Sequence, residues 1–435
     1  MSTPSFYDLG ISKDTSAVLA KKGYEYPTAI QEALIPAFSD SSQDIIAQAD
    51  TGTGKTGAFG IPLIDTMDES EKHVQAIAIA PTRELASQVA KELAVYKGQR
   101  KIDIIECCGG QGMREQIEKL KKTKRACIVV GTPGRILDHI NKKRLNLKKI
   151  EYLIIDEVDE MLNFGFKEDM DAIVDNTNPD RRTIILSATL PKFVMKVANS
   201  YLVNPMSINT TSEASGQKPQ IEQTFYKCDR INKVKLLSRV IDSFPEFYGF
   251  IFCNTKREVD ELAATLINHG YSVECMHGDL SQAQRERSLA KFKTKQCDIL
   301  VVTDVAARGI DVKNISHVIN YSVPQNTEVY THRIGRTGRA GQSGVSITFV
   351  KEREFFKFKR IIKQQKGGIK KKEVPTAAEV LDSKKAKFLT DVQTCEPKGF
   401  HLDMAKSILK DRSPEDAIAS ILKIRCRDLF NKSNY

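Results

Sequence analysis

The stretch Ile45-Ile-Ala47-Gln-Ala49-Asp-Thr-Gly52-Thr-Gly54-Lys55-Thr56 decides how the first half of this chain is interpreted. A short apolar run, Ile45 to Ala47, leads into a glycine-rich loop, and a helix-like segment follows. A strand that passes through such a loop into a helix is typical of a parallel α/β domain. Loop N–H groups and the N-terminus of the helix can cradle phosphates. The order therefore predicts a phosphate-binding loop on an α/β domain.

The predicted phosphate loop consists of Ala49, Asp50, Thr51, Gly52, Thr53, Gly54, Lys55 and Thr56. Lys55 would reach the β- and γ-phosphates, and the Thr56 hydroxyl would hold Mg²⁺. The strict pattern has glycine where Ala49 stands, so the loop departs from it by one residue. A glycine-rich loop that only closes a helix is the alternative.

Apolar runs alternate with amphipathic segments along most of the chain. In the first half the further runs are 75–80, 126–130, 152–155 and 183–186. After a polar stretch the alternation restarts, with runs at 249–253, 272–276, 299–303, 317–321 and 344–349. Continuous apolar strands separated by helices indicate parallel sheets covered on both faces. We expect an α/β fold: two tandem domains, each a doubly wound parallel sheet.

Changes in composition give the domain boundaries. We assign residues 1–208 to the first domain, 209–220 to a flexible linker, 221–363 to the second domain and 364–435 to a basic, mainly helical extension. Ser413 and Pro414 predict a helix start in the extension, because serine is a favoured cap and proline is favoured at the first helical position.

The bulk composition excludes several classes of protein. The nine cysteines are scattered without a Cys-x-x-Cys motif, which argues against a disulfide framework or a zinc site and for a reducing compartment. The N-terminus lacks the basic and apolar regions of a secretory signal. No apolar run approaches the ~20 residues of a membrane helix. We therefore expect a cytoplasmic protein.

The net charge of +11 is concentrated at one end. About 21 basic and about 12 acidic residues from Lys351 onward supply roughly +9 of it. This end is a candidate polyanion-binding surface, and a solvated lysine-rich face is the alternative.

The run Asp156-Glu157-Val158-Asp159 directly follows the expected strand 152–155. A carboxylate at the carboxyl end of a strand can hold Mg²⁺, and Asp156 fits that role, through a water molecule. Glu157 would be the base that polarises the attacking water. An acidic helix N-cap, which the helix dipole favours, is the alternative.

A basic run, His332-Arg-Ile-Gly-Arg336-Thr-Gly-Arg339, lies in the other half of the chain. Arg336 and Arg339 stand three residues apart beside glycines, and cations supplied across a cleft can stabilise charge on a γ-phosphate. A basic loop that only binds nucleic acid is the alternative. The sequence thus predicts an ATP-hydrolysing apparatus divided between two domains.

In this order, the motifs resemble those of the DEAD-box RNA helicases over about residues 6–350. In the first half, Phe6 with residues 23–31 resembles the adenine-reading Q motif. The RNA-contacting elements of the family resemble residues 81–86, 109–110 and 132–135. Residues 187–189 resemble the motif that couples hydrolysis to strand separation. In the second half, 250–255, 282–285, 303–311 and 332–339 resemble motif IV, the Q-x-x-R element, motif V and motif VI.

The resemblance implies two RecA-like domains, ATP and Mg²⁺ as cofactors, and RNA-stimulated ATP hydrolysis coupled to domain closure and local, non-processive duplex separation or remodelling of RNA–protein complexes. RNA would be held by its backbone without sequence reading, and 2′-hydroxyl contacts would exclude DNA. The residues implied to bind nucleotide are the phosphate loop with Phe6, Pro27, Thr28, Gln31, Gly309, Asp311 and Arg339. The residues implied in catalysis are Lys55, Asp156, Glu157, Ser187, Thr189, His332, Arg336 and Arg339. The residues implied to contact RNA are Pro81, Thr82, Arg83, Gly110, Thr132, Pro133, Gly134, Arg135, Asn254, Thr255, Gln282, Arg285, Thr303 and Arg308.

Two first-domain residues depart from the family pattern. Val158 stands where the family has alanine, which adds two methyl groups but removes no carboxylate. Asp50 places a carboxylate in the phosphate loop, where it would repel phosphates unless it points outward.

The extension resembles the region after the core in bacterial cold-shock DEAD-box helicases, which often dimerise through such helices. We expect homodimerisation through the C-terminal helices and no RNA-binding domain after them; docking of the apolar stripe on the chain's own core is the alternative. For the whole chain the alternatives are a DNA helicase or translocase and an ATP-dependent RNA clamp within a larger assembly. Comparing how strongly RNA and DNA stimulate ATP hydrolysis would distinguish the DNA helicase or translocase. Measuring the turnover of ATP would distinguish the RNA clamp.

Overall fold

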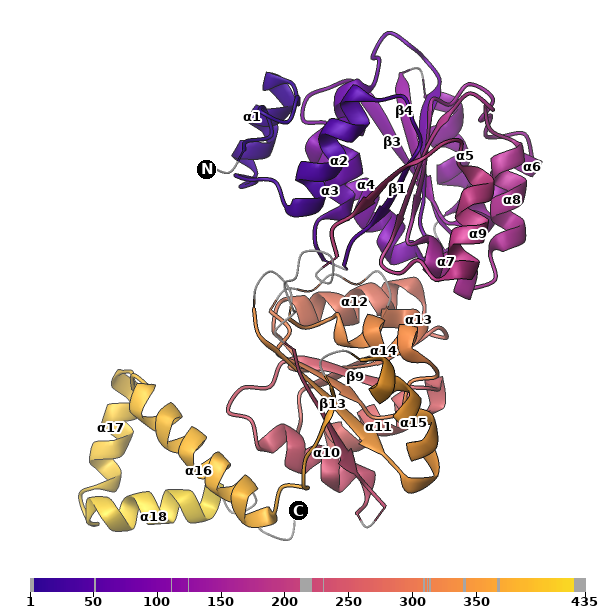
Figure 1. Cartoon of the computed structure of the whole chain (residues 1–435). Helices are drawn as coiled ribbons and strands as arrows, with labels where there is room; N and C mark the ends of the chain where they lie inside the picture. The colour runs from indigo at the N-terminus through magenta and orange to yellow at the C-terminus, as the bar shows by residue number, and fades with distance from the viewer. Residues whose placement is uncertain are drawn as a thin grey trace.

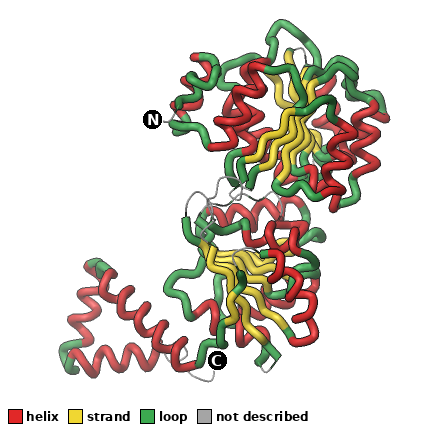
Figure 2. The backbone as a smooth tube through the Cα atoms, viewed as in Figure 1, coloured by secondary structure: helices red, strands yellow, loops and turns green. Residues whose placement is uncertain are grey.

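The chain forms two α/β domains and a helical extension (Figures 1 and 2). This computed structural model describes residues 4–50, 52–110, 112–123, 125–211, 221–229, 231–307, 310, 312, 314–338, 342–365 and 368–425. None of the described helices is both long and apolar enough to cross a membrane.

The first domain is a seven-stranded parallel sheet in the order β3-β4-β2-β5-β6-β1-β7. Its strands are β1 (Ile45–Gln48), β2 (Val74–Ile79), β3 (Ile102–Cys107), β4 (Ala126–Gly131), β5 (Tyr152–Asp156), β6 (Arg182–Ser187) and β7 (Met206–Asn209). Its helices are α1 (Lys13–Lys21), α2 (Ala29–Asp40), α3 (Lys55–Thr66), α4 (Arg83–Tyr96), α5 (Met113–Lys122), α6 (Pro133–Asn141), α7 (Val158–Asn163), α8 (Lys167–Asp175) and α9 (Lys192–Tyr201).

Both faces of this sheet are buried. Along β1, Ile45 and Ala47 belong to a core beneath α1 to α4, whereas Ile46 belongs to a second core beneath α5 to α9. Alternate residues of a strand face opposite sides, so most positions of a doubly covered strand are apolar. The helix groups lie on opposite sides of the sheet in Figure 1.

The second domain repeats this topology, with the strand order β10-β11-β9-β12-β13-β8-β14. Its strands are β8 (Ile221–Lys227), β9 (Gly249–Cys253), β10 (Val273–Met276), β11 (Ile299–Thr303), β12 (His317–Asn320), β13 (Gly344–Val350) and β14 (Lys370–Lys371). Its helices are α10 (Lys233–Asp242), α11 (Lys256–Asn268), α12 (Gln282–Lys293), α13 (Asp304–Ala307), α14 (Thr327–Ile334) and α15 (Glu352–Gln364).

Every expected strand is present, and the fold adds four that the apolar runs did not predict: β3, β7, β8 and β14. In β3, buried positions are interrupted by partly buried ones, and in β7 partly buried and exposed positions alternate, because these strands lie at the edges of the first sheet. The short β14 pairs with β8 and extends the second sheet into the segment we had assigned to the extension.

The extension consists of α16 (Ala377–Thr394), α17 (Gly399–Ile408) and α18 (Pro414–Arg425). Ser413 accepts a hydrogen bond from the Asp416 N–H at 3.1 Å, so the predicted helix start is confirmed. Only the start of α16 docks on the second domain, where Val380 and Leu381 are buried and Lys384 pairs with Asp242 at 2.8 Å. The far end of α16 and α17 lie away from the second domain, and α18 runs back toward the start of α16 (Figure 1).

Candidate functional site

The phosphate loop joins β1 to α3 at the centre of the first sheet. Gly54 caps α3 with φ +91° and offers no side chain to the free N–H groups of the helix. Lys55 is buried, and its Nζ donates to the Ala49 carbonyl at 3.1 Å. Thr56 is buried directly after it. A helix N-terminus with unsatisfied N–H groups and a buried lysine is an anion-binding site.

The predicted adenine-reading residues contact this loop from α2. Gln31 accepts a hydrogen bond from the Thr28 N–H at 3.0 Å and donates to the Gly54 carbonyl at 3.1 Å. A Cβ on Gly54 would lie 2.7 Å from Gln31 Nε2, so only glycine fits here. Phe6 and Pro27 are buried beside α2. The Q motif and the phosphate loop are therefore one packed unit.

The strand order brings the predicted carboxylates to the same edge. β5, which ends at Asp156, and β1 both pair with β6, which ends at Ser187. Burial raises the pKa of Asp156, and the neighbouring Glu157 adds to this effect, while Lys55 opposes it. Glu157 has φ +54° and ψ +52°, a left-handed conformation that is strained for a residue with a side chain. Backbone strain at this position is typical of a functional residue.

Val158, the departure within the acidic run, is fully buried with Met161 in the core beneath α7. The two extra methyl groups therefore point into the core and leave the carboxylates at the sheet edge. Asp50 is partly buried and has an interaction partner.

Asp159 joins three of the predicted motifs. Its Oδ2 accepts hydrogen bonds from the Thr189 N–H at 3.0 Å and the Thr189 hydroxyl at 2.7 Å. The Ser187 hydroxyl donates to the Thr189 carbonyl at 2.6 Å. His332 Nε2, from the second domain, lies 3.7 Å from the same Asp159 oxygen. One buried carboxylate thus links the acidic run, the 187–189 motif and motif VI.

His332 also pairs with Glu160 across the domain boundary, through its Nδ1 atom. Burial by itself would lower the pKa of His332, but Glu160 and Asp159 outweigh burial and raise that pKa above its ordinary value. The protonated ring is therefore the favoured form when the two domains are in contact.

The arginines of motif VI have different roles. Arg336 is buried and donates to the Ile310 carbonyl at 2.8 Å. Arg333 is 1% exposed and fully bonded: it grips Asp304 through two nitrogens, at 2.5 and 2.8 Å, and reaches Asn254 at 2.9 Å. Arg333 therefore holds motifs IV, V and VI together, whereas the printed bond of Arg336 ties motif VI to Ile310 within the same domain. Sequence reasoning missed Arg333 and Asp304, which could have been found only through their complementary charges.

The predicted RNA-contacting residues of the first domain follow the carboxyl ends of β2, β3 and β4. Thr82 caps α4, and the exposed Arg83 lies against the tight turn that contains Gly110. A Cβ on Gly110 would come within 2.1 Å of the Arg83 guanidinium. Thr132 precedes α6, and Arg135 donates to Gln116 at 3.0 Å; Pro81 and Pro133 are buried, and Gly134 is exposed.

In the second domain, the predicted RNA-contacting residues follow β9 and β11 and open α12. Asn254 and Thr255 are exposed after β9, and Thr303 ends β11. Gln282 donates to Glu286 at 3.0 Å. Arg285 forms a largely buried ion pair with Glu84 of the first domain at 3.0 Å. Glu84 is thus an interdomain residue that sequence reasoning did not single out.

Five predicted site residues lie outside the described residues: Thr51, Arg308, Gly309, Asp311 and Arg339.

Comparison with known proteins agrees with this geometry. The family model for DEAD/DEAH box helicases matches residues 28–197, and the model for the helicase conserved C-terminal domain matches residues 232–341. The DEAD-box ATP-dependent RNA helicase CshA of Geobacillus kaustophilus is 39% identical over 98% of this chain and 91% of its own length. CshA of Bacillus subtilis is 37% identical over 98% of this chain and 86% of its own length.

Solved structures show the same two-domain fold. A DEAD box protein from Methanococcus jannaschii is 44% identical and covers 85% of this chain and 99% of its own, with a TM-score of 0.52. S. cerevisiae Dbp5 bound to RNA and ADP BeF3 is 28% identical and covers 88% and 99%, with a TM-score of 0.78. On its sequence, its fold and the convergence of its motifs, the chain belongs to the DEAD-box ATP-dependent RNA helicases.

Proposed function

We propose that this helicase binds ATP on its first domain and hydrolyses it only when the second domain closes over the nucleotide together with RNA. The observation that carries the proposal is the contact of His332 with Asp159 and Glu160. This contact joins motif VI to the acidic run, and Asp159 also accepts a hydrogen bond from the Thr189 hydroxyl. A change in domain contact is thereby transmitted to the residues that surround the γ-phosphate.

The phosphates bind in the loop before α3, where Lys55 exchanges its bond to the Ala49 carbonyl for phosphate oxygens. The site fits Mg²⁺, because Asp156 Oδ1 is buried without a hydrogen-bond partner among the described residues and the charge of Lys55, the residue before Thr56, acts on the same carboxylate. Asp156, through water, and Thr56 would hold the ion, which would neutralise charge on the phosphates. The Gln31 amide retains a second hydrogen and a second lone pair for adenine.

Glu157 acts as the base. Its carboxylate accepts the proton of the attacking water, whose oxygen forms the new bond to the γ-phosphorus as the bond to ADP breaks. Arg336, with Arg339, supplies positive charge to the γ-phosphate from the second domain. Because these cations belong to the second domain, hydrolysis requires closure.

RNA binds across the carboxyl ends of both sheets, where Arg83, Thr132, Asn254 and Thr303 lie. Loops at this edge can contact consecutive phosphates and 2′-hydroxyl groups without reading bases. The Glu84–Arg285 ion pair spans the two domains within this surface, so RNA and closure favour each other.

ATP hydrolysis with matched RNA and DNA strands tests the proposal. RNA is expected to stimulate turnover and DNA is not; equal stimulation by both would support a DNA translocase instead. The variant Glu157→Gln is expected to retain RNA in the presence of ATP while turnover stops, by about 10² to 10⁴-fold. If Glu157→Gln hydrolysed ATP at the rate of the parent, Glu157 would not be the base. If the parent itself did not turn over ATP, the RNA clamp would be favoured.

We also propose that the protein is cytoplasmic and forms a homodimer through the extension. The described cysteines are all free thiols, as expected in a reducing compartment. In α17 and α18 the large apolar side chains Phe400, Met404, Ile418 and Ile424 are exposed rather than docked on the core. Such surfaces favour association. Light scattering tests it: Phe400→Ser with Ile418→Ser is expected to give a monomer, and an unchanged mass would contradict dimerisation here.

A further inference from the structure

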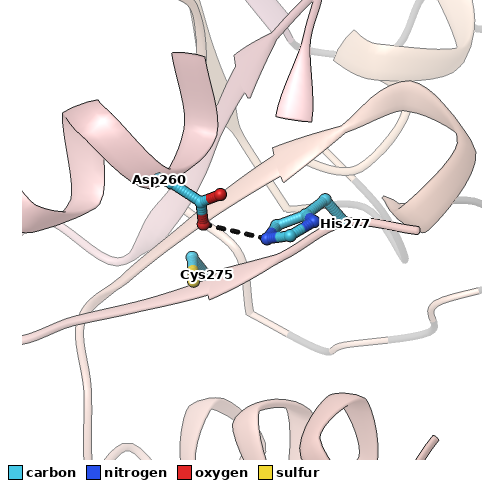
Figure 3. A group of neighbouring side chains, drawn as sticks. All are labelled: Asp260, Cys275 and His277. Atoms are coloured by element: carbon cyan, nitrogen blue, oxygen red, sulfur yellow. Dashed lines mark hydrogen bonds and ion pairs between the residues drawn. The ribbon is translucent and has the colours of Figure 1, made fainter. Parts of the chain in front are cut away.

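We infer that Asp260, Cys275 and His277 form a binding site for a thiophilic divalent cation of the zinc class on the second domain. Cys275 lies in β10, and His277 follows the end of that strand two positions later. Side chains two positions apart in an extended segment point to the same side. Asp260 reaches the same place from α11, which packs on β10 (Figure 3).

The three ligand atoms form a compact set. A carboxylate oxygen, the sulfur and a ring nitrogen all lie within 4.8 Å of one another. His277 Nε2 already lies 2.9 Å from Asp260 Oδ1. A sulfur, a nitrogen and an oxygen donor together suit Zn²⁺, and hard cations such as Mg²⁺ avoid this combination. Three protein ligands leave a fourth position, which water can fill because the Asp260 side chain is 55% exposed.

A cation that binds here must displace the proton of the Cys275 thiol. Burial, and then the charges of Asp260 and Glu274, raise the pKa of the Cys275 thiol, so the thiol keeps its proton without a cation. A divalent cation replaces that proton: the S–H bond breaks, a sulfur–metal bond forms and one proton leaves to solvent. The thiolate and the Asp260 carboxylate then balance the charge of the cation.

A structural brace between Asp260 and His277 is the competing explanation. It accounts for the hydrogen bond, but Cys275 has no part in it. His277 Nδ1 is buried without a hydrogen-bond partner among the described residues in either arrangement, so the cysteine sulfur is what distinguishes them. In the cation site, Nδ1 carries the ring proton and Nε2 is free to coordinate.

The position of the site gives it a consequence. The loop after His277 is tied to α11 a second time, by an ion pair between Lys256 and Asp279, and then enters α12. Arg285 of α12 forms the interdomain ion pair with Glu84. A cation on Asp260 and His277 therefore holds the loop that positions an interdomain contact.

Titration of the full-length, tag-free and reduced chain with Co²⁺ in excess Mg²⁺ tests the site, because Mg²⁺ occupies oxygen-only sites and the sulfur–cobalt absorption reports thiolate ligation alone. The parent is expected to bind one equivalent with this absorption, and Zn²⁺ is expected to displace it. Cys275→Ser should lose the absorption, and Asp260→Asn should bind at least about tenfold more weakly. Cys395→Ser, which removes the exposed thiol of the extension, should match the parent.

Zn²⁺ is also expected to raise the thermal midpoint of the parent but not that of Cys275→Ser, since a ligand that binds only the folded state stabilises it. Circular dichroism should show that all variants fold. The inference is overturned if the parent shows no sulfur–cobalt absorption, which would leave the brace, or if Cys275→Ser retains it, which would assign the signal to another thiol.

Discussion

The two domains share one strand order, yet only the first carries a phosphate site. In the first, β1 leads into α3 through a glycine loop; at the corresponding place in the second, β8 leads into α10. Both helices begin with a lysine, Lys55 and Lys233. Gly54 leaves the N-terminal amides of α3 uncapped, whereas Asn232 caps α10 by accepting hydrogen bonds from the Val234 N–H at 2.8 Å and the Lys235 N–H at 3.4 Å.

The shared fold therefore places a helix N-terminus at the same position in both domains, and the loop before that helix determines whether it can bind an anion. Free helix amides bind anions, and amides that a side chain already satisfies do not. Lys233 is likewise engaged, because its Nζ donates to the Tyr321 carbonyl at 2.6 Å and lies over the Tyr321 ring. Among the described residues, the start of α10 therefore offers no free amides or lysine comparable to the loop before α3.

The largest expected effect follows from removing the contribution of the second domain. Arg336→Ala should lower the RNA-stimulated turnover of ATP by about 10³-fold or more, because the γ-phosphate loses a cation in the transition state. ATP affinity should change little, since the phosphate loop is intact. Steady-state kinetics and nucleotide titration measure the two quantities.

The matched control is Arg257→Ala, which removes an exposed arginine of the same domain that pairs with Glu261. It should turn over ATP like the parent. Parent-like turnover by Arg336→Ala would mean that the second domain is no source of catalytic charge.

The second effect contrasts the two lysines directly. Lys55→Ala should lower kcat/KM for ATP by about 10² to 10³-fold, because a buried phosphate donor is lost. Lys233→Ala, at the same position of the second domain, should leave kcat/KM within about twofold of the parent. Similar losses in both variants would contradict the assignment of the nucleotide to the first domain alone.

A third, smaller effect concerns pH. Contact between the domains raises the pKa of His332, so closure takes up a proton. The contribution of His332 to closure is fully present below the ordinary histidine pKa of about 6.5 and is lost as the pH rises through the raised value. The apparent RNA affinity in the presence of an ATP analogue should therefore weaken over this window in the parent.

His332→Gln should flatten that pH dependence, whereas His269→Gln, at the end of α11, should retain it. A pH profile that survives His332→Gln unchanged would assign the proton to another group.

The smallest expected effect concerns the cap of α10 in the second domain. Asn232→Ala removes the cap of α10 and should cost about 1 kcal/mol of stability, visible as a lower thermal midpoint. ATP affinity and turnover should not change, because no nucleotide binds there. A loss of ATP affinity would show that α10 takes part in the nucleotide site.

Much of this architecture could be predicted from the sequence. Continuous apolar runs locate the doubly covered strands, and the order of the motifs places Asp156 and Ser187 at the ends of their strands and Lys55 at the start of α3. Strands β3, β7 and β8 were not predicted, because their partly polar sequences carry no continuous apolar run. Edge positions relax the requirement for burial on both faces.

Contacts between distant segments could not be predicted in this way. The sequence did not predict that Asp159 accepts two hydrogen bonds from Thr189, which the structure shows. The five hydrogen bonds of Arg333 and the pairing of Glu84 with Arg285 depend on how the loops pack in space. The convergence of Asp260, Cys275 and His277 likewise could not be predicted, because their spacing matches no linear motif.

The central claim, that closure completes the ATP site, is tested most directly by energy transfer between dyes on the two domains. Val203→Cys and Ile267→Cys place the dyes on exposed positions, one in each domain, in a background in which Cys395→Ser and Cys426→Ser remove both cysteines of the extension. High transfer is predicted only when an ATP analogue and RNA are present together, and Lys55→Ala should abolish it. High transfer without ligands, or an unchanged response in Lys55→Ala, would contradict the account.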